Sequence, residues 1–213
     1  MKPEILARIQ QLGGNIDQVK GQSLSDNLQA ITFNSVLYPR PLDTPWSTAD
    51  EEEPIYGLNK FVDEHLTLFT IDRAALYRKI TDHFYQNTDE PRGQMFFRND
   101  LLTPFKEGTD DWTEWNSDFT DPEIVDLSEI YKITDNKDPE FICLAYSYGF
   151  PDTFYLCLSD PNPENPTVFG TDHEVFFREI SNNGTLEAFF QQFMTKEELL
   201  EIVRTRLETT ETT

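Results

Sequence analysis

The chain has 213 residues, of which 38% are hydrophobic, and its 17 Lys and Arg against 39 Asp and Glu give a net charge of −22. Its 17 Phe, 8 Tyr and 3 Trp supply enough bulky apolar surface for a core, which argues against a disordered chain. The charge argues against nucleic acid and anionic membranes as partners, because phosphate binding needs clustered Lys and Arg. It fits either a basic protein partner or a simple solubilising surface.

The sequence matches neither the pattern of a membrane helix nor that of a secretory signal. No segment reaches the roughly 18 consecutive apolar residues that a membrane helix needs. The first ten residues, MKPEILARIQ, are charged where a secretory signal has an apolar stretch. We therefore expect a cytoplasmic location. The two cysteines, Cys143 and Cys157, come nearly opposite each other in a predicted hairpin, which allows a disulfide, but two buried free thiols are the preferred interpretation.

The N-terminal part of the chain is predicted to be mainly helix and loop. Residues 3–12 form an amphipathic pattern that begins with a proline and ends at two glycines, which predicts a short helix. A strand is predicted at residues 31–38, before three prolines interrupt regular structure. Residues 43–53 contain five acids and no base, which predicts an exposed loop.

The middle of the chain combines one clear helix with the most acidic segment. A helix capped by Thr70 or Asp72 is predicted to run to about Gln86, because its apolar residues recur four apart. Residues 107–129 then contain nine acids and no Lys or Arg. Alternating residues at 129–134 predict a strand.

The C-terminal part reads as successive strands followed by two helices. Strands are predicted at residues 141–146, 154–158, 168–169 and 175–180. Thr185 starts a helix, and Thr195 with Glu198 forms a capping box that opens a final helix to about Leu207. Because the strands are bunched late, the order favours an α+β fold with an antiparallel sheet, a mixed sheet being the alternative.

Candidate catalytic and metal-binding residues give weak signals. Asp172, His173 and Glu174 are consecutive, so on a strand they point to alternate faces, and local hydrogen bonding is the preferred interpretation. Catalysis would require Asp172, His173 and a remote acid to converge in a cleft. Residues 160–164 open like a calcium loop but lack the later Gly and Glu, and the cysteines and histidines match no zinc spacing. We expect no metal, no cofactor and no catalytic residue.

Carboxylates with nearby aromatic residues are the best candidates for partner binding. Charged rims around aromatic anchors are common in protein interfaces. The alternative is that the carboxylates are merely solvated and the tryptophans belong to the core. The predicted contact residues are Asp50, Glu51, Glu52, Glu53, Asp110, Asp111, Trp112 and Trp115.

Four motifs in the C-terminal half occur in a characteristic order. They are FYLCLSD at 154–160, PTVF at 166–169, DHE at 172–174 and TLEAFF at 185–190. Over roughly residues 125–205 this order resembles the SUKH superfamily. The resemblance implies a single α+β domain over residues 1–213, made of a divergent, acidic N-terminal part (1–124), a strand-rich part (125–207) and a frayed tail (208–213).

The resemblance also implies a function without catalysis. Bacterial members of this superfamily are typically immunity proteins that neutralise toxins, and fungal members regulate cell-wall synthesis. We therefore expect a protein that binds and covers a toxin, and the acidic charge would suit a basic one. An intracellular regulatory scaffold without a toxin partner is the alternative, and a small hydrolase ranks below both.

Overall fold

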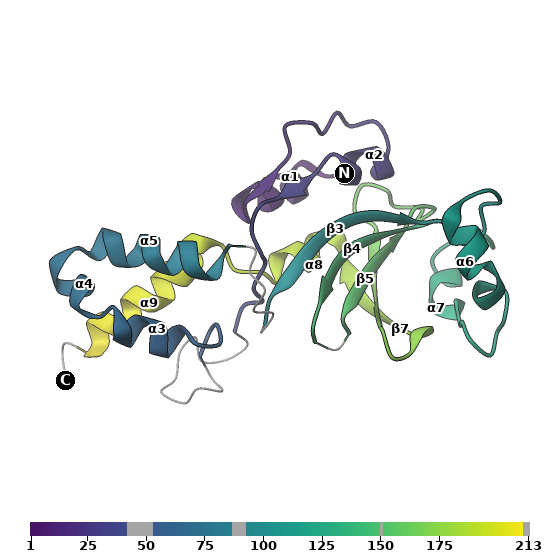
Figure 1. The fold of residues 1–213 in the computed structure, drawn as a ribbon. Helices are drawn as coiled ribbons and strands as arrows, with labels where there is room; N and C mark the ends of the chain where they lie inside the picture. The colour runs from purple at the N-terminus through teal and green to yellow at the C-terminus, as the bar shows by residue number, and fades with distance from the viewer. Residues whose placement is uncertain (42–52, 87–92, 150, 211–213) are drawn as a thin grey trace.

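The computed structural model describes residues 1–41, 53–86, 93–149 and 151–210. These residues form an α+β fold around a five-stranded antiparallel sheet in the order β3-β4-β5-β6-β7 (Figure 1). The strands are β3 (Met95–Leu102), β4 (Phe141–Ser147), β5 (Thr153–Cys157), β6 (Thr167–Asp172) and β7 (Phe176–Thr185). Two short strands, β1 (Gly14–Asn15) and β2 (Thr32–Phe33), pair separately. The predicted fold class and antiparallel sheet are confirmed.

Alternation along the strands gives the sheet two buried faces. Ile142 and Leu156 belong to one hydrophobic cluster, whereas Phe141, Tyr155 and Cys157 belong to another. Neighbouring side chains of a strand point to opposite faces, so a run such as 154–157 supplies both clusters at once. Each face therefore needs its own covering helices.

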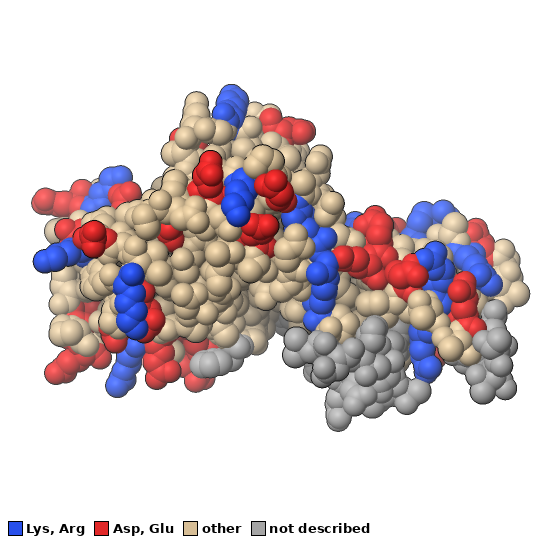
Figure 2. Space-filling model, turned by 180° about the vertical axis from the view of Figure 1, so that it is seen from behind, with Lys and Arg blue, Asp and Glu red and all other residues tan. Residues whose placement is uncertain are grey.

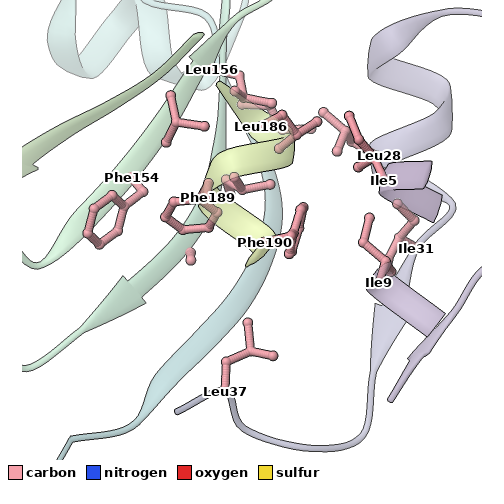
Figure 3. Close-up of a cluster of buried hydrophobic side chains, with 14 of the residues drawn as sticks. Ile5, Ile9, Leu28, Ile31, Leu37, Phe154, Leu156, Leu186, Phe189 and Phe190 are labelled. Atoms are coloured by element: carbon pink, nitrogen blue, oxygen red, sulfur yellow. The ribbon is translucent and has the colours of Figure 1, made fainter. Parts of the chain in front are cut away.

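The first face is covered by α1 (Pro3–Gln11), α2 (Leu24–Gln29) and α8 (Leu186–Gln191). Figure 3 shows Phe189 and Phe190 of α8 lying between the strands and the side chains of Ile5 and Ile9. Helix α8 begins where predicted, because the Thr185 side chain accepts a hydrogen bond from the Ala188 N–H. This packing joins the first helix of the chain to the C-terminal part.

A bundle of four helices forms one end of the molecule (Figure 1). It contains α3 (Leu58–Glu64), α4 (Thr67–Ile71), α5 (Arg73–Phe84) and α9 (Lys196–Thr210). Asp72 caps α5 by accepting from the Ala75 N–H at 2.9 Å, and the capping box of Thr195 and Glu198 is formed in both directions. Because α9 packs against α3 and α5, the C-terminal helix shares one core with helices from the middle of the chain.

The opposite end carries α6 (Asp110–Phe119) and α7 (Ser128–Tyr131) (Figure 1). Phe119 of α6 and Ile130 of α7 pack with Phe141 and Phe177 against the second face of the sheet. The helix α6 is thereby fixed in orientation by its own apolar side. Its other side is left for solvent.

Two predicted strands differ in the structure. Residues 129–134 were expected to be extended, but Ser128–Tyr131 is helical, because the Asp126 carboxylate accepts from the Ser128 N–H and starts a turn there. That hydrogen bond also lowers the pKa of Asp126. The strand predicted at 31–38 is reduced to Thr32–Phe33, with a single bridge from Leu37 to Met95.

The cysteines are free thiols, as the preferred interpretation expected. The hairpin register places Cys143 opposite Tyr155, and Cys157 opposite Phe141. The two cysteines are therefore not cross-strand partners. Burial raises the pKa of Cys143 to about 12, so this thiol stays protonated at neutral pH.

Candidate functional site

The helix α6 presents a face of carboxylates that the structure leaves unpaired. Thr109 caps the helix by accepting from the Trp112 N–H at 3.1 Å, and two aspartates in the first turn complement the helix dipole. Asp110, Glu114 and Asp118 follow at a spacing of four, so they share one side of the helix. These three residues are called the acidic row below.

No Lys or Arg of the described chain forms an ion pair with the acidic row. The nearest lysines along the sequence are engaged elsewhere, Lys106 with Glu140 at 3.1 Å and Lys132 with Glu129. Asp110 and Glu114 are exposed, and Asp118 is half-buried. Figure 2, which views the molecule from behind, shows Asp and Glu side chains interspersed with Lys and Arg at the end that carries α6 and α7. The row therefore directs a negative field outward.

Asp111, which was predicted to contact a partner, has a structural task. Its Oδ2 atom accepts hydrogen bonds from the N–H of Thr103 at 2.8 Å and from the hydroxyl of Thr103 at 3.0 Å. These bonds fasten the first turn of α6 to the end of β3. Asp111 thus holds the helix in place, while its neighbour Asp110 faces solvent.

The two tryptophans of α6 have different environments. Trp115 stacks on Phe176 with ring centroids 5.1 Å apart and packs against the hydrophobic cluster under the helix. Trp112 is half-buried in the first turn and belongs to no buried cluster of the described residues. Trp115 matches the structural alternative, and Trp112 is the aromatic residue available at the surface.

The other predicted contact group lies elsewhere. The Glu53 carboxylate accepts from the N–H groups of Gly57 and Asn59 and so caps α3. Since α3 and α6 lie at opposite ends of the molecule, the structure does not bring Glu53 to the acidic row (Figure 1). Asp50, Glu51 and Glu52 lie outside the described residues.

The predicted triplet 172–174 forms local hydrogen bonds and gains a remote acid. The Glu174 N–H donates to Asp172 Oδ1 at 2.9 Å, as expected for a turn. Asp152, at the start of β5, accepts from the His173 N–H at 3.1 Å and is also bonded to His173 Nδ1. This side-chain bond to Asp152 raises the pKa of His173. Asp152, Asp172 and His173 are called the Asp/His cluster below.

The sequence contains a signal for Asp152 that the prediction did not use. Asp152 directly precedes β5, and Asp172 ends β6, the next strand. Thr153 pairs with Thr171 in the antiparallel ladder, so the residues just outside that pair must be close. Correct pairing of the two strands would have identified the cluster.

An aromatic group on β3 and β4 was also missed. Phe96 stacks on Tyr146 at 4.8 Å between ring centroids, and the guanidinium of Arg98 lies 4.5 Å from the centre of the Tyr146 ring. Tyr148 contacts both rings edge-on and is itself exposed. The group provides a second exposed aromatic surface beside a cation.

Known protein families, curated proteins and solved structures contain no match to this chain in the comparisons made. Among the described residues, no helix has both the length and the apolar character needed to cross a membrane. The fold and the site thus define an α+β protein with an acidic, unpaired helix face.

Proposed function

We propose that this protein is a non-catalytic binding protein that captures a basic protein partner through α6. The acidic row carries the proposal. Three carboxylates on one helix face, without an ion-pair partner among the described residues, leave their charge to act on another molecule. Such a field raises the association rate with an oppositely charged partner and disfavours acidic ones.

Trp112 supplies the apolar part of the proposed interface. It is half-buried beside Asp110, and Trp115 holds the helix against Phe176 so that the surface is rigid before binding. Buried tryptophans are frequent binding hot spots, whereas exposed charges mainly affect the rate of encounter. The proposed division is that the acidic row steers the partner and Trp112 anchors it.

In its more specific form, the proposal is that the partner is a toxin domain and that the protein is a cytoplasmic immunity protein. The support is the resemblance of residues 125–205 to the SUKH superfamily, together with the net charge of −22. A basic toxin, such as one that acts on nucleic acid, would meet an inhibitor of opposite charge. Inhibition would then be occlusion, in which α6 covers the surface that the toxin uses.

The test is co-expression with the protein encoded by the adjacent reading frame, scored for cell survival. The wild-type chain should rescue growth when that neighbour is toxic. An acidic-row variant that removes three charges should rescue less well, and a control variant that removes three exposed charges at the opposite end should rescue fully. The two variants are Asp110→Asn/Glu114→Gln/Asp118→Asn and Asp63→Asn/Glu64→Gln/Asp82→Asn.

Equal rescue by both variants would remove α6 from the mechanism. If no neighbouring protein is toxic and none binds, the toxin partner is contradicted. Binding of the neighbour without toxicity would favour the regulatory scaffold. A reversed preference, in which acidic proteins bind better than basic ones, would overturn the proposal as a whole.

A further inference from the structure

We propose that the Asp/His cluster binds a divalent transition metal ion, with Zn²⁺ the ion that its donors suit best. One ligand atom from each of Asp152, Asp172 and His173 lies within 4.8 Å of the other two. Asp152 directly precedes β5, Asp172 is the last residue of β6, and His173 lies between β6 and β7. The cluster is therefore a product of the fold and not of adjacent sequence alone.

The donor atoms match zinc chemistry. Zn²⁺ binds imidazole nitrogen and carboxylate oxygen at roughly 2.0–2.2 Å, which places tetrahedral donors roughly 3.4 Å apart. His173 Nδ1 and Asp172 Oδ1 are separated by 3.7 Å. The imidazole favours Zn²⁺ over Mg²⁺ and Ca²⁺, which prefer oxygen donors throughout. Three protein donors leave a fourth position for water.

One adjustment is needed for an ion to enter. His173 Nδ1 now contacts Asp152 Oδ2 directly by a hydrogen bond, so the ion must separate these two atoms. The His173 side chain is 74% exposed, and a small outward rotation of its ring displaces no core packing. The two carboxylates, by contrast, are held by the strands and would stay in place.

The electrostatics of the carboxylates supply an independent reason for a cation. The Asp172 side chain is only 5% exposed. Its Oδ1 atom accepts a hydrogen bond from the Glu174 N–H. Its Oδ2 atom accepts no hydrogen bond from any described residue. Neither Asp172 nor Asp152 forms an ion pair with a described Lys or Arg, and His173 is the one group of opposite charge near them. Two largely buried carboxylates that share a single histidine have at most one positive charge between them, and a divalent ion would offset both.

A bound ion would stabilise the turn that supports α6. Phe176 is paired with Asp172 across this turn, and Trp115 of α6 stacks on Phe176. Holding Asp172 and His173 to Asp152 would therefore restrain the surface beneath the helix. The metal site does not depend on the proposed function, because it requires no partner.

The experiment is a calorimetric titration of Zn²⁺ into the full chain after treatment with a chelator. Saturable binding of one ion is expected, and His173→Ala should weaken it by at least about tenfold, because one of three ligands is lost. His83→Ala is the matched control, since His83 is an exposed histidine stacked on Phe61 in the helical bundle. The control should bind Zn²⁺ as the wild type does.

Co²⁺ provides a second measurement that depends on geometry. Co²⁺ bound by a nitrogen and two oxygens in four-coordination gives visible absorption, which should be absent in His173→Ala and in Asp172→Asn. Zn²⁺ should also raise the melting temperature of the wild type but not of His173→Ala, because ligand binding stabilises only the form with the site. Absence of saturable binding, equal affinity in His173→Ala, or an equal loss in His83→Ala would each overturn the proposal.

Discussion

Replacing Arg8 by methionine is the sharpest test of how the fold is held together. The Arg8 side chain is 8% exposed, although it is charged. Its Nη2 atom donates to the carbonyl of Phe193 at 2.5 Å and to Glu198 Oε2 at 3.2 Å, and its Nε donates to the carbonyl of Phe190 at 3.5 Å. One guanidinium thus joins α1 to the end of α8 and the start of α9.

The expected loss is about 3 kcal/mol of unfolding free energy. A hydrogen bond from a charged donor contributes about 1.5–3 kcal/mol, and a buried acceptor left without a donor costs about 1–3 kcal/mol. Methionine keeps the apolar stem of Arg8, so little packing is lost. Glu198 would retain its bonds from the Thr195 N–H and from Arg40, which limits the damage.

Arg40→Met is the matched control, because Arg40 reaches the same carboxylate from the surface. Its side chain is 40% exposed, and water can replace its contacts with Glu198 and with the carbonyl of Gln191. The expected cost is about 1 kcal/mol or less. Urea unfolding of both variants measures the difference. Equal losses, or a loss below about 1 kcal/mol for Arg8→Met, would refute the assigned role of Arg8.

Three further changes have defined outcomes. Gly170→Ala should destabilise the fold by about 1–3 kcal/mol in urea unfolding. The Cβ atom of the alanine would lie 2.9 Å from Pro151 and 2.6 Å from the Asn183 amide. An unchanged free energy of unfolding would contradict tight packing at this position. Burial alone would raise the pKa of Glu198, but hydrogen bonds and charges from the Thr195 N–H and two arginines lower it overall. The free energy of unfolding should therefore fall as the pH drops below 4.5, the ordinary pKa of a glutamate. Glu198→Gln should flatten this part of the stability–pH curve. Trp115→Ala should cost about 2 kcal/mol of stability, whereas a Trp112→Ala variant that lost as much would place Trp112 in the core.

Local signals in the sequence were sufficient for the helices α1, α5, α8 and α9 and for the strands β4 to β7, but β3 and the helices α2, α3, α4 and α6 were not predicted. The caps at Asp72, Thr185 and Thr195 act within three residues of themselves, so the helices they begin are readable from sequence alone. The hairpin of β4 and β5 was likewise predictable from two apolar runs around a turn.

Short apolar patterns were ambiguous. Tyr131 and Ile133 alternate as on a strand, whereas Ile130 and Ile133 are three apart as on one face of a helix. Six residues do not distinguish the two periods. In the structure a hydrogen bond from outside the pattern, made by Asp126, decides for the helix. A local turn closed by an aspartate side chain therefore outweighed the alternation.

The candidate sites depended on contacts that sequence spacing does not reveal. A spacing of four places Asp110, Glu114 and Asp118 on one face of α6, but that helix was not predicted from the sequence. The engagement of Asp111 by Thr103 and of Trp115 by Phe176 requires the tertiary fold. The Asp/His cluster likewise needs the pairing of β5 with β6 before Asp152 meets His173. Spacing along a helix predicts which residues share a face, whereas the approach of Asp152 to His173 follows only from the pairing of β5 with β6.

The most direct test of the central claim is the association rate of the purified protein with its basic partner at low and high ionic strength. The acidic-row variant should associate about tenfold more slowly than the wild type at low salt and should lose most of the salt dependence. The control variant at Asp63, Glu64 and Asp82 should keep the association rate and its salt dependence. The only change expected in it is the small one that follows from losing three negative charges of the whole molecule. An acidic-row variant that associates as fast as the control would contradict the assignment of α6 as the steering surface.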